Sequence, residues 1–105
     1  MDKEFNDKIK QETVFLLESA RNFLVALENA ARSGRIDPFL QALQQLHKVI
    51  GEILGLTKLM QANLEEFREL FDRATKETQE LLQKAFEIME EFRRRLEERC
   101  KGSIK

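Results

Sequence analysis

The chain has 105 residues, the length of one small domain, with 18 lysine and arginine residues against 19 aspartate and glutamate residues and a formal net charge of -1. This balance gives no overall field that would attract nucleic acid or an anionic membrane. The single cysteine excludes an internal disulfide, and no stretch approaches the roughly 18 consecutive apolar residues of a membrane span, so we expect a cytoplasmic protein without a transmembrane helix.

The first third of the chain predicts one long amphipathic helix over about residues 3–33. Its apolar and small residues alternate in steps of four and three, as they do on one face of a bundle helix. We call such a row of core-facing positions the apolar seam of a helix. They are Ile9, Thr13, Leu16, Ala20, Phe23, Leu27 and Ala30. A turn follows at Ser33–Pro38, where Gly34 suits a left-handed helix end, Asp37 suits an N-cap and Pro38 suits the first position of the next helix.

The same spacing resumes after Pro38, at Phe39, Leu43, Leu46 and Ile50, and predicts a second helix over about 38–73. Gly51 and Gly55 weaken this helix in propensity, each by about 1 kcal/mol relative to alanine, and a break at Gly55 is the main alternative. We place the end of the helix near Thr75 instead, because the favoured apolar positions shift phase around Thr78 and continue as Thr78, Leu82 and Ala85. A third helix is then expected over about 76–101.

These elements predict an all-α fold, an antiparallel up-down-up three-helix bundle with long, coiled-coil-like helices, forming a single domain over residues 1–105. Folding at the two turns predicts that Gly51 faces Ala20, which gives the glycine a role in close helix approach. It also predicts that Phe92 of the third helix lies beside Thr57.

No residue pattern indicates an enzyme, a metal site or a cofactor site. His47, the only histidine, lacks a second ligand three or four positions away. Cys100 lies at the end of the expected third helix, where the negative end of the helix dipole disfavours a thiolate. The chain has no second cysteine that could form a disulfide with an oxidised Cys100. The carboxylates avoid the apolar positions and recur four residues before arginine or lysine, which is typical of a solvated helix face. We therefore expect no catalytic residues, no bound cofactor and no small-molecule substrate.

The densest basic stretch, Arg93–Arg95, offers a weak signal for nucleic acid. Four glutamates between positions 90 and 98 interleave with these arginines, whereas tracking a phosphate backbone needs an uncompensated basic stripe. A nucleic-acid-associated protein using this part of the third helix stays an alternative function.

Apolar residues outside the expected core positions point instead to protein contact. The candidate interface residues are Val14, Phe15, Val25, Leu59 and Phe86, together with Met89, a core-row position that flanks Phe86. We therefore predict a non-enzymatic interaction module, such as a small scaffold, adaptor or chaperone-like bundle, whose partner is another protein or a second copy of the chain, with a homodimer favoured. An engineered bundle without a natural function is a further alternative, although the mid-helix glycines and seam threonines are unlike idealised designs.

Overall fold

The computed structural model describes the backbone of residues 2–104 and the side chains of residues 2–101, and nearly all of this chain is helical. Three long helices follow in order: α1 (Lys3–Ser33), α2 (Ile36–Met60) and α3 (Leu64–Ile104). A short 3-10 turn, η1 (Gln61–Asn63), joins α2 to α3. Met1 and Lys105, the two ends of the predicted domain, lie outside the described residues.

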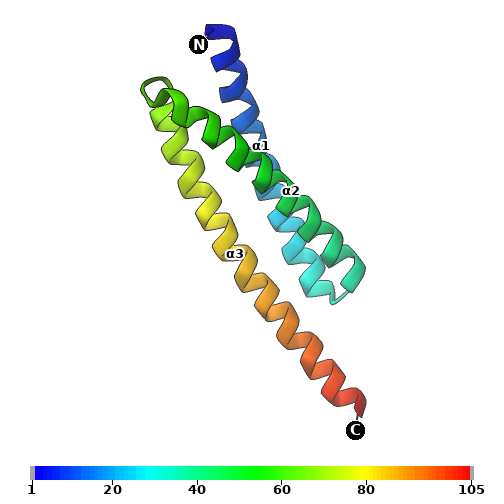
Figure 1. Cartoon of the computed structure of the whole chain (residues 1–105). Helices are drawn as coiled ribbons and strands as arrows, with labels where there is room; N and C mark the ends of the chain where they lie inside the picture. The colour runs from blue at the N-terminus through cyan, green and yellow to red at the C-terminus, as the bar shows by residue number, and fades with distance from the viewer. Residues whose placement is uncertain (1, 105) are drawn as a thin grey trace.

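The first helix packs against both of the others (Figure 1). Two ion pairs tie α1 to α3, one between Lys10 and Glu66 and one between Arg21 and Glu77, and both join residues 56 positions apart. A constant offset places the two helices side by side with the same direction. The molecule measures 65 × 18 × 15 Å, and α3 continues past the turn between α1 and α2 (Figure 1).

The first turn is set by Gly34, as its position after the first apolar run predicts. Its φ of 73° is left-handed, and its N–H donates to the carbonyls of Ala30 and Ala31, which closes the end of α1. The start of α2 differs from the prediction, because Arg35 is the N-cap residue and Asp37 lies within the first helical turn. Pro38 lies in that turn too, where a missing N–H costs no hydrogen bond.

Two arginines of α3 reinforce this end of α1. The guanidinium of Arg95 donates to the Ala31 carbonyl over 3.2 Å, and that of Arg99 donates to the Gly34 carbonyl over 2.8 Å. Positive charge is favourable at a helix C-terminus, where the carbonyls lack helical partners. These contacts hold α3 against the α1–α2 turn.

The second turn is neither at Gly55 nor near Thr75, and both predicted positions were wrong. The chain reverses at Gln61–Asn63, so α2 ends at Met60 rather than residue 73 and α3 begins at Leu64 rather than residue 76. The apolar spacing hid this turn because Met60 and Phe67, on either side of it, are both buried against Ile9. A heptad-like rhythm therefore runs on through residues that belong to two different helices.

The apparent phase shift around Thr78 has no structural counterpart. The buried residues of α3 include Thr78, Leu81 and Ala85, a regular four-three spacing, whereas the predicted seam used Leu82. Leu82 is exposed beside the core. One uninterrupted helix therefore accounts for the whole segment that we had expected to contain a break.

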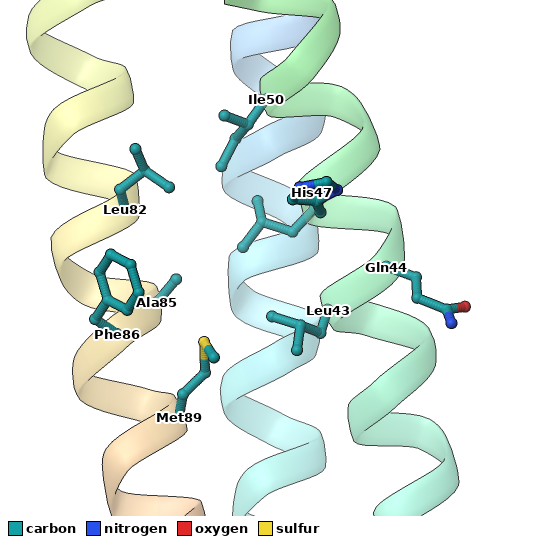
Figure 2. A pocket seen from close by; sticks show the side chains of 9 residues that line it. Leu43, Gln44, His47, Ile50, Leu82, Ala85, Phe86 and Met89 are labelled. Carbon is teal, nitrogen blue, oxygen red and sulfur yellow. The ribbon is translucent and has the colours of Figure 1, made fainter.

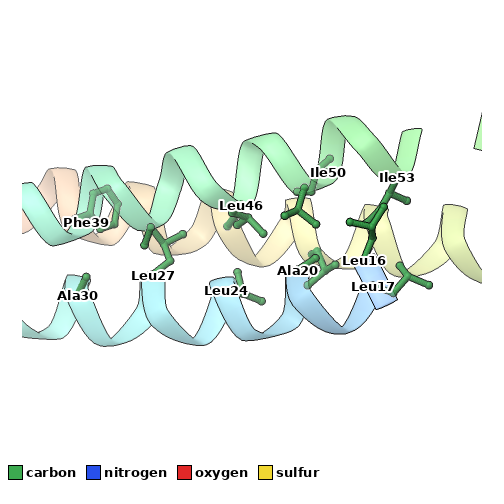
Figure 3. Packing of buried hydrophobic residues seen from close by; sticks show 14 of the residues in the cluster. Leu16, Leu17, Ala20, Leu24, Leu27, Ala30, Phe39, Leu46, Ile50 and Ile53 are labelled. Carbon is green, nitrogen blue, oxygen red and sulfur yellow. The ribbon is translucent and has the colours of Figure 1, made fainter. Parts of the chain in front are cut away.

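The main core lies between facing rows of α1 and α2 and is completed by α3 (Figure 3). Leu17, Leu27 and Ile53 are fully buried there. Phe92 stacks on Phe39, with ring centroids 3.9 Å apart and an interplanar angle of 11°. The predicted placement of Phe92 beside Thr57 was wrong, because it assumed the turn near Thr75.

The predicted role of the α2 glycines was also wrong. Gly51 and Gly55 are exposed, and a Cβ added at either position meets no atom within 4 Å. They therefore do not mediate a close approach of α1 to α2. Their cost in helix propensity has no compensating contact within the chain.

Candidate functional site

An apolar groove runs between α2 and α3 on the side away from α1. We call it the α2–α3 groove, and its volume is about 360 Å³. Its lining residues come from one stretch of each helix: Leu43, Gln44, Leu46, His47 and Ile50 from α2, and Leu82, Ala85, Phe86 and Met89 from α3. Figure 2 shows Leu43, Ile50 and Met89 turned toward the space between the helices, while Gln44 points away from α3.

The α3 side of the groove carries its largest exposed side chain. Phe86 is 64% exposed, the highest value among the large hydrophobic residues, and Leu82 is exposed beside it. Met89 is half-buried and packs against the core. The helical spacing of Leu82, Ala85, Phe86 and Met89 puts all four on one edge of α3, of which only Ala85 belongs to the core.

The α2 side of the groove has very few charges. No charged residue occurs between Asp37 and Lys48, and the groove-facing surface continues beyond the hollow through Leu40, 48% exposed, and Leu54, 51% exposed. A solvent-facing helix surface usually carries charged residues at these positions. The structure therefore leaves exposed apolar side chains on α2 on both sides of the hollow, in addition to those on the adjacent edge of α3.

The predicted interface residues separate into groups. Phe86 and Met89 come together in the α2–α3 groove. Val14 and Phe15 share a shallow hollow on α1 with charged neighbours, and Val25 lies beside the Arg21–Glu77 ion pair. Leu59 is exposed near the end of α2. The hollow at Val25 also joins two helices, but four of its seven lining residues are charged, whereas the groove has no aspartate, glutamate, lysine or arginine in its lining.

The α2 half of this site was missed by the sequence analysis. Leu43 and Ile50 were assigned to the core-facing row of the second helix, and His47 was considered only as a metal ligand. The run without charges from Pro38 to His47 was the signal that pointed to a covered surface.

The arginines of the predicted basic stretch are engaged by acidic neighbours on α3. Arg93 pairs with Glu90 and Glu97, and Arg94 pairs with Glu91. Hydrogen bonding and the charge of Glu90 raise the pKa of Arg93, and the same contact lowers the pKa of Glu90. The surface here is a network of exposed ion pairs with both signs of charge.

The described residues form no cluster of metal-binding side chains. Among them, no group of three or more histidine, cysteine, aspartate or glutamate side chains is placed to hold a metal ion. Cys100 is a free, exposed thiol. Within the described range, each helix has too few apolar residues in succession to cross a lipid bilayer.

Comparisons of the chain with protein-family models, with curated proteins and with solved structures gave no match.

Proposed function

We propose that the chain is a non-enzymatic interaction module, an up-down-up three-helix bundle that binds an apolar helix face of a protein in the α2–α3 groove. The single observation that carries this proposal is the exposure of Phe86 in a groove walled by leucine, isoleucine and methionine side chains. Grooves of this kind accept amphipathic helices through residues spaced three and four apart.

The distribution of charge supports this function over the nucleic-acid alternative. Among the charges of the arginine stretch, those of Arg93 and Arg94 are compensated on their own helix, so they present no uncompensated phosphate-binding stripe. The groove itself offers apolar contact. We assign the module to the cytoplasm, where a reducing environment keeps the exposed Cys100 a thiol.

Photochemical cross-linking from the groove tests this function. Phe86 is replaced by the photoreactive residue benzoylphenylalanine, and the chain is irradiated inside its native cells. The control carries the same residue in place of Phe15, which is 60% exposed on α1. We expect protein adducts from position 86 that position 15 does not form. Absence of adducts at position 86, or the same adducts from both positions, would contradict the proposal.

A further inference from the structure

We infer that a second copy of this chain covers the α2–α3 groove, paired through a two-fold axis that is perpendicular to the helices. In this arrangement α3 lies against α3 of the second copy and α2 lies against α2, and the two copies run in opposite directions. The inference rests on the proposed function, because it names the partner of the same groove. The order of charged and uncharged residues along one exposed row of α3 carries it.

This outer row of α3 lies on the groove side of the helix, because Leu82 and Phe86 belong to it and line the groove. Its residues follow one another in steps of three and four, which keeps them on one edge of the helix. All of them are exposed: Arg68, Asp72, Thr75, Gln79, Leu82, Phe86, Glu90, Arg93 and Glu97. The middle of the row, from Thr75 to Phe86, is uncharged, and both ends are charged.

The two charged ends are complementary to each other when the second copy is antiparallel. Arg68 and Glu97 lie equally far along α3 from the bond Leu82–Gln83, and so do Asp72 and Arg93. A two-fold axis at that bond therefore sets Arg68 opposite Glu97 of the second copy. It also sets Asp72 opposite Arg93. Each of these pairs occurs twice in the dimer, and complementarity of this kind selects one partner and one register.

Other antiparallel registers lose the match. Sliding the second copy by about one helical turn in one direction sets Arg68 opposite Arg93. Sliding it by the same amount in the other direction sets Asp72 opposite Glu97, and both contacts join like charges. A slide of two turns places a carboxylate, that of Asp72 or Glu90, against the apolar side chains of the row. The carboxylate then loses water without gaining a partner.

The side chains at both ends are able to form these contacts. Arg68 and Asp72 have no ion-pair partner among the described residues. Arg93 pairs with Glu90 and Glu97 of its own helix, and a guanidinium has enough N–H donors to bind Asp72 of the second copy as well. Glu97 accepts through Oε1, which leaves Oε2 for Arg68. The residues at each end thus form one network of alternating charge.

The α2 side of the face fits the same axis. Figure 2 shows Leu82 at about the level of His47, so the axis passes α2 near His47. Leu40 and Leu54 lie equally far from His47 along α2, and the antiparallel pair therefore sets each of them against the other in the second copy. Both are about half exposed in the single chain. Their contact, with that of Leu82 and Phe86, removes exposed apolar surface from water.

A parallel pair offers no such match. A two-fold axis along the helices sets α3 against α2 of the second copy and keeps every residue at its own height. Phe92 stacks on Phe39, so Arg93 would lie near Leu40 of the second copy. Leu40 belongs to the stretch without charges, Pro38–His47. The charges at this end of α3 would be covered by apolar side chains, whereas antiparallel pairing covers them with opposite charges.

Sedimentation equilibrium over a range of concentrations tests the self-pairing. We expect the wild-type chain to form a dimer and Phe86→Asp to weaken it at least tenfold, because the new charge lies in the middle of the contact. Phe15→Asp, on α1, is the matched control and should leave the dissociation constant unchanged. A wild-type chain that stays monomeric, or equal weakening by both variants, overturns the inference.

Charge reversal tests the orientation and the register. Asp72→Arg alone and Arg93→Asp alone each create like-charge contacts at both ends of the dimer, so each should weaken it at least tenfold with unchanged helical circular dichroism. A mixture of the two variants restores opposite charges at both ends, and it should form a heterodimer about as tight as the wild-type dimer. The control Glu80→Arg, in the hollow beside α1, should have no effect.

A mixture that dimerises no more tightly than either variant alone overturns the antiparallel register, because Asp72 and Arg93 meet in no parallel pair. The self-pairing and the proposed function can also fail separately. If the wild-type chain is monomeric yet position 86 cross-links to other proteins in cells, the self-pairing fails and the proposed function stands. Absence of those adducts removes both.

Discussion

At the scale of single residues, the buried threonines differ in how their hydroxyl groups are satisfied. Thr13 donates its hydroxyl to the Ile9 carbonyl over 2.7 Å. The hydroxyl oxygen of Thr78 is buried without a hydrogen-bond partner among the described residues. A buried hydroxyl that lacks a partner keeps its full cost of desolvation. Thr78 therefore occupies a position where an apolar residue of the same shape suits the core better.

We predict that Thr78→Val raises the free energy of unfolding by about 1 kcal/mol, because the cost of burying the hydroxyl disappears. Urea unfolding followed by circular dichroism measures this change. Thr13→Val is the matched control, in which a satisfied hydroxyl is lost and little or no gain is expected. A destabilised Thr78→Val variant would mean that its hydroxyl forms a hydrogen bond in solution.

At the scale of helices, one of the ion pairs that join α1 to α3, Lys10–Glu66, has a strength that depends on pH. The hydrogen bond from Lys10 lowers the pKa of Glu66 below its ordinary 4.5, and the same contact raises the pKa of Lys10 above 10.5. A carboxylate with a lowered pKa stabilises the fold fully above its unfolded value, and that stabilisation disappears as the pH falls through the folded value.

We therefore predict that the thermal midpoint falls between about pH 5 and pH 3, and that Glu66→Gln makes this fall shallower. Melting curves recorded by circular dichroism across this range measure it. The effect is small and shrinks with added salt, since both side chains are exposed. The control is Glu12→Gln, on the exposed face of α1, which should retain the wild-type fall. An unchanged slope in Glu66→Gln would show that the Lys10 contact contributes nothing.

The two turns show how much of the helix layout the sequence predicts. The first was predictable because a special backbone conformation is needed there, and Gly34 is the residue type that adopts it. The second requires no glycine or proline, since η1 is flanked by ordinary right-handed residues. Its position depends on Met60 and Phe67 packing on Ile9, which is a tertiary contact. Local sequence signals do not record such contacts.

For the same reason, the sequence predicted the α3 side of the groove and not its α2 side. Phe86 was found because it lies off the apolar seam of its own helix, and Met89 was found because it flanks Phe86. The residues of α2 that face them were hidden, since Leu43 and Ile50 fit the seam and join the groove only once α3 is placed. The position of α3 depends on where the second turn lies. Because the predicted position of that turn was wrong, the α2 residues of the groove were not recognised.

At the scale of the whole molecule, the shape separates the possible modes of pairing. The chain is an elongated body of 65 × 18 × 15 Å with a radius of gyration of 17.3 Å. Two such bodies that lie side by side at one height form a particle that is wider and hardly longer than one chain. A staggered or end-to-end pair is longer in proportion to the stagger.

We accordingly predict that the Phe86→Asp variant scatters X-rays at small angles as a single chain, with a radius of gyration close to 17.3 Å at every concentration. Phe86 is 64% exposed, so its replacement should leave the three helices packed while it adds a charge to the α2–α3 groove. Small-angle X-ray scattering over a range of concentrations measures this quantity, and Phe15→Asp is the matched control. A radius of gyration that rises with concentration in the Phe86→Asp variant would show that the chain associates through a surface other than the groove.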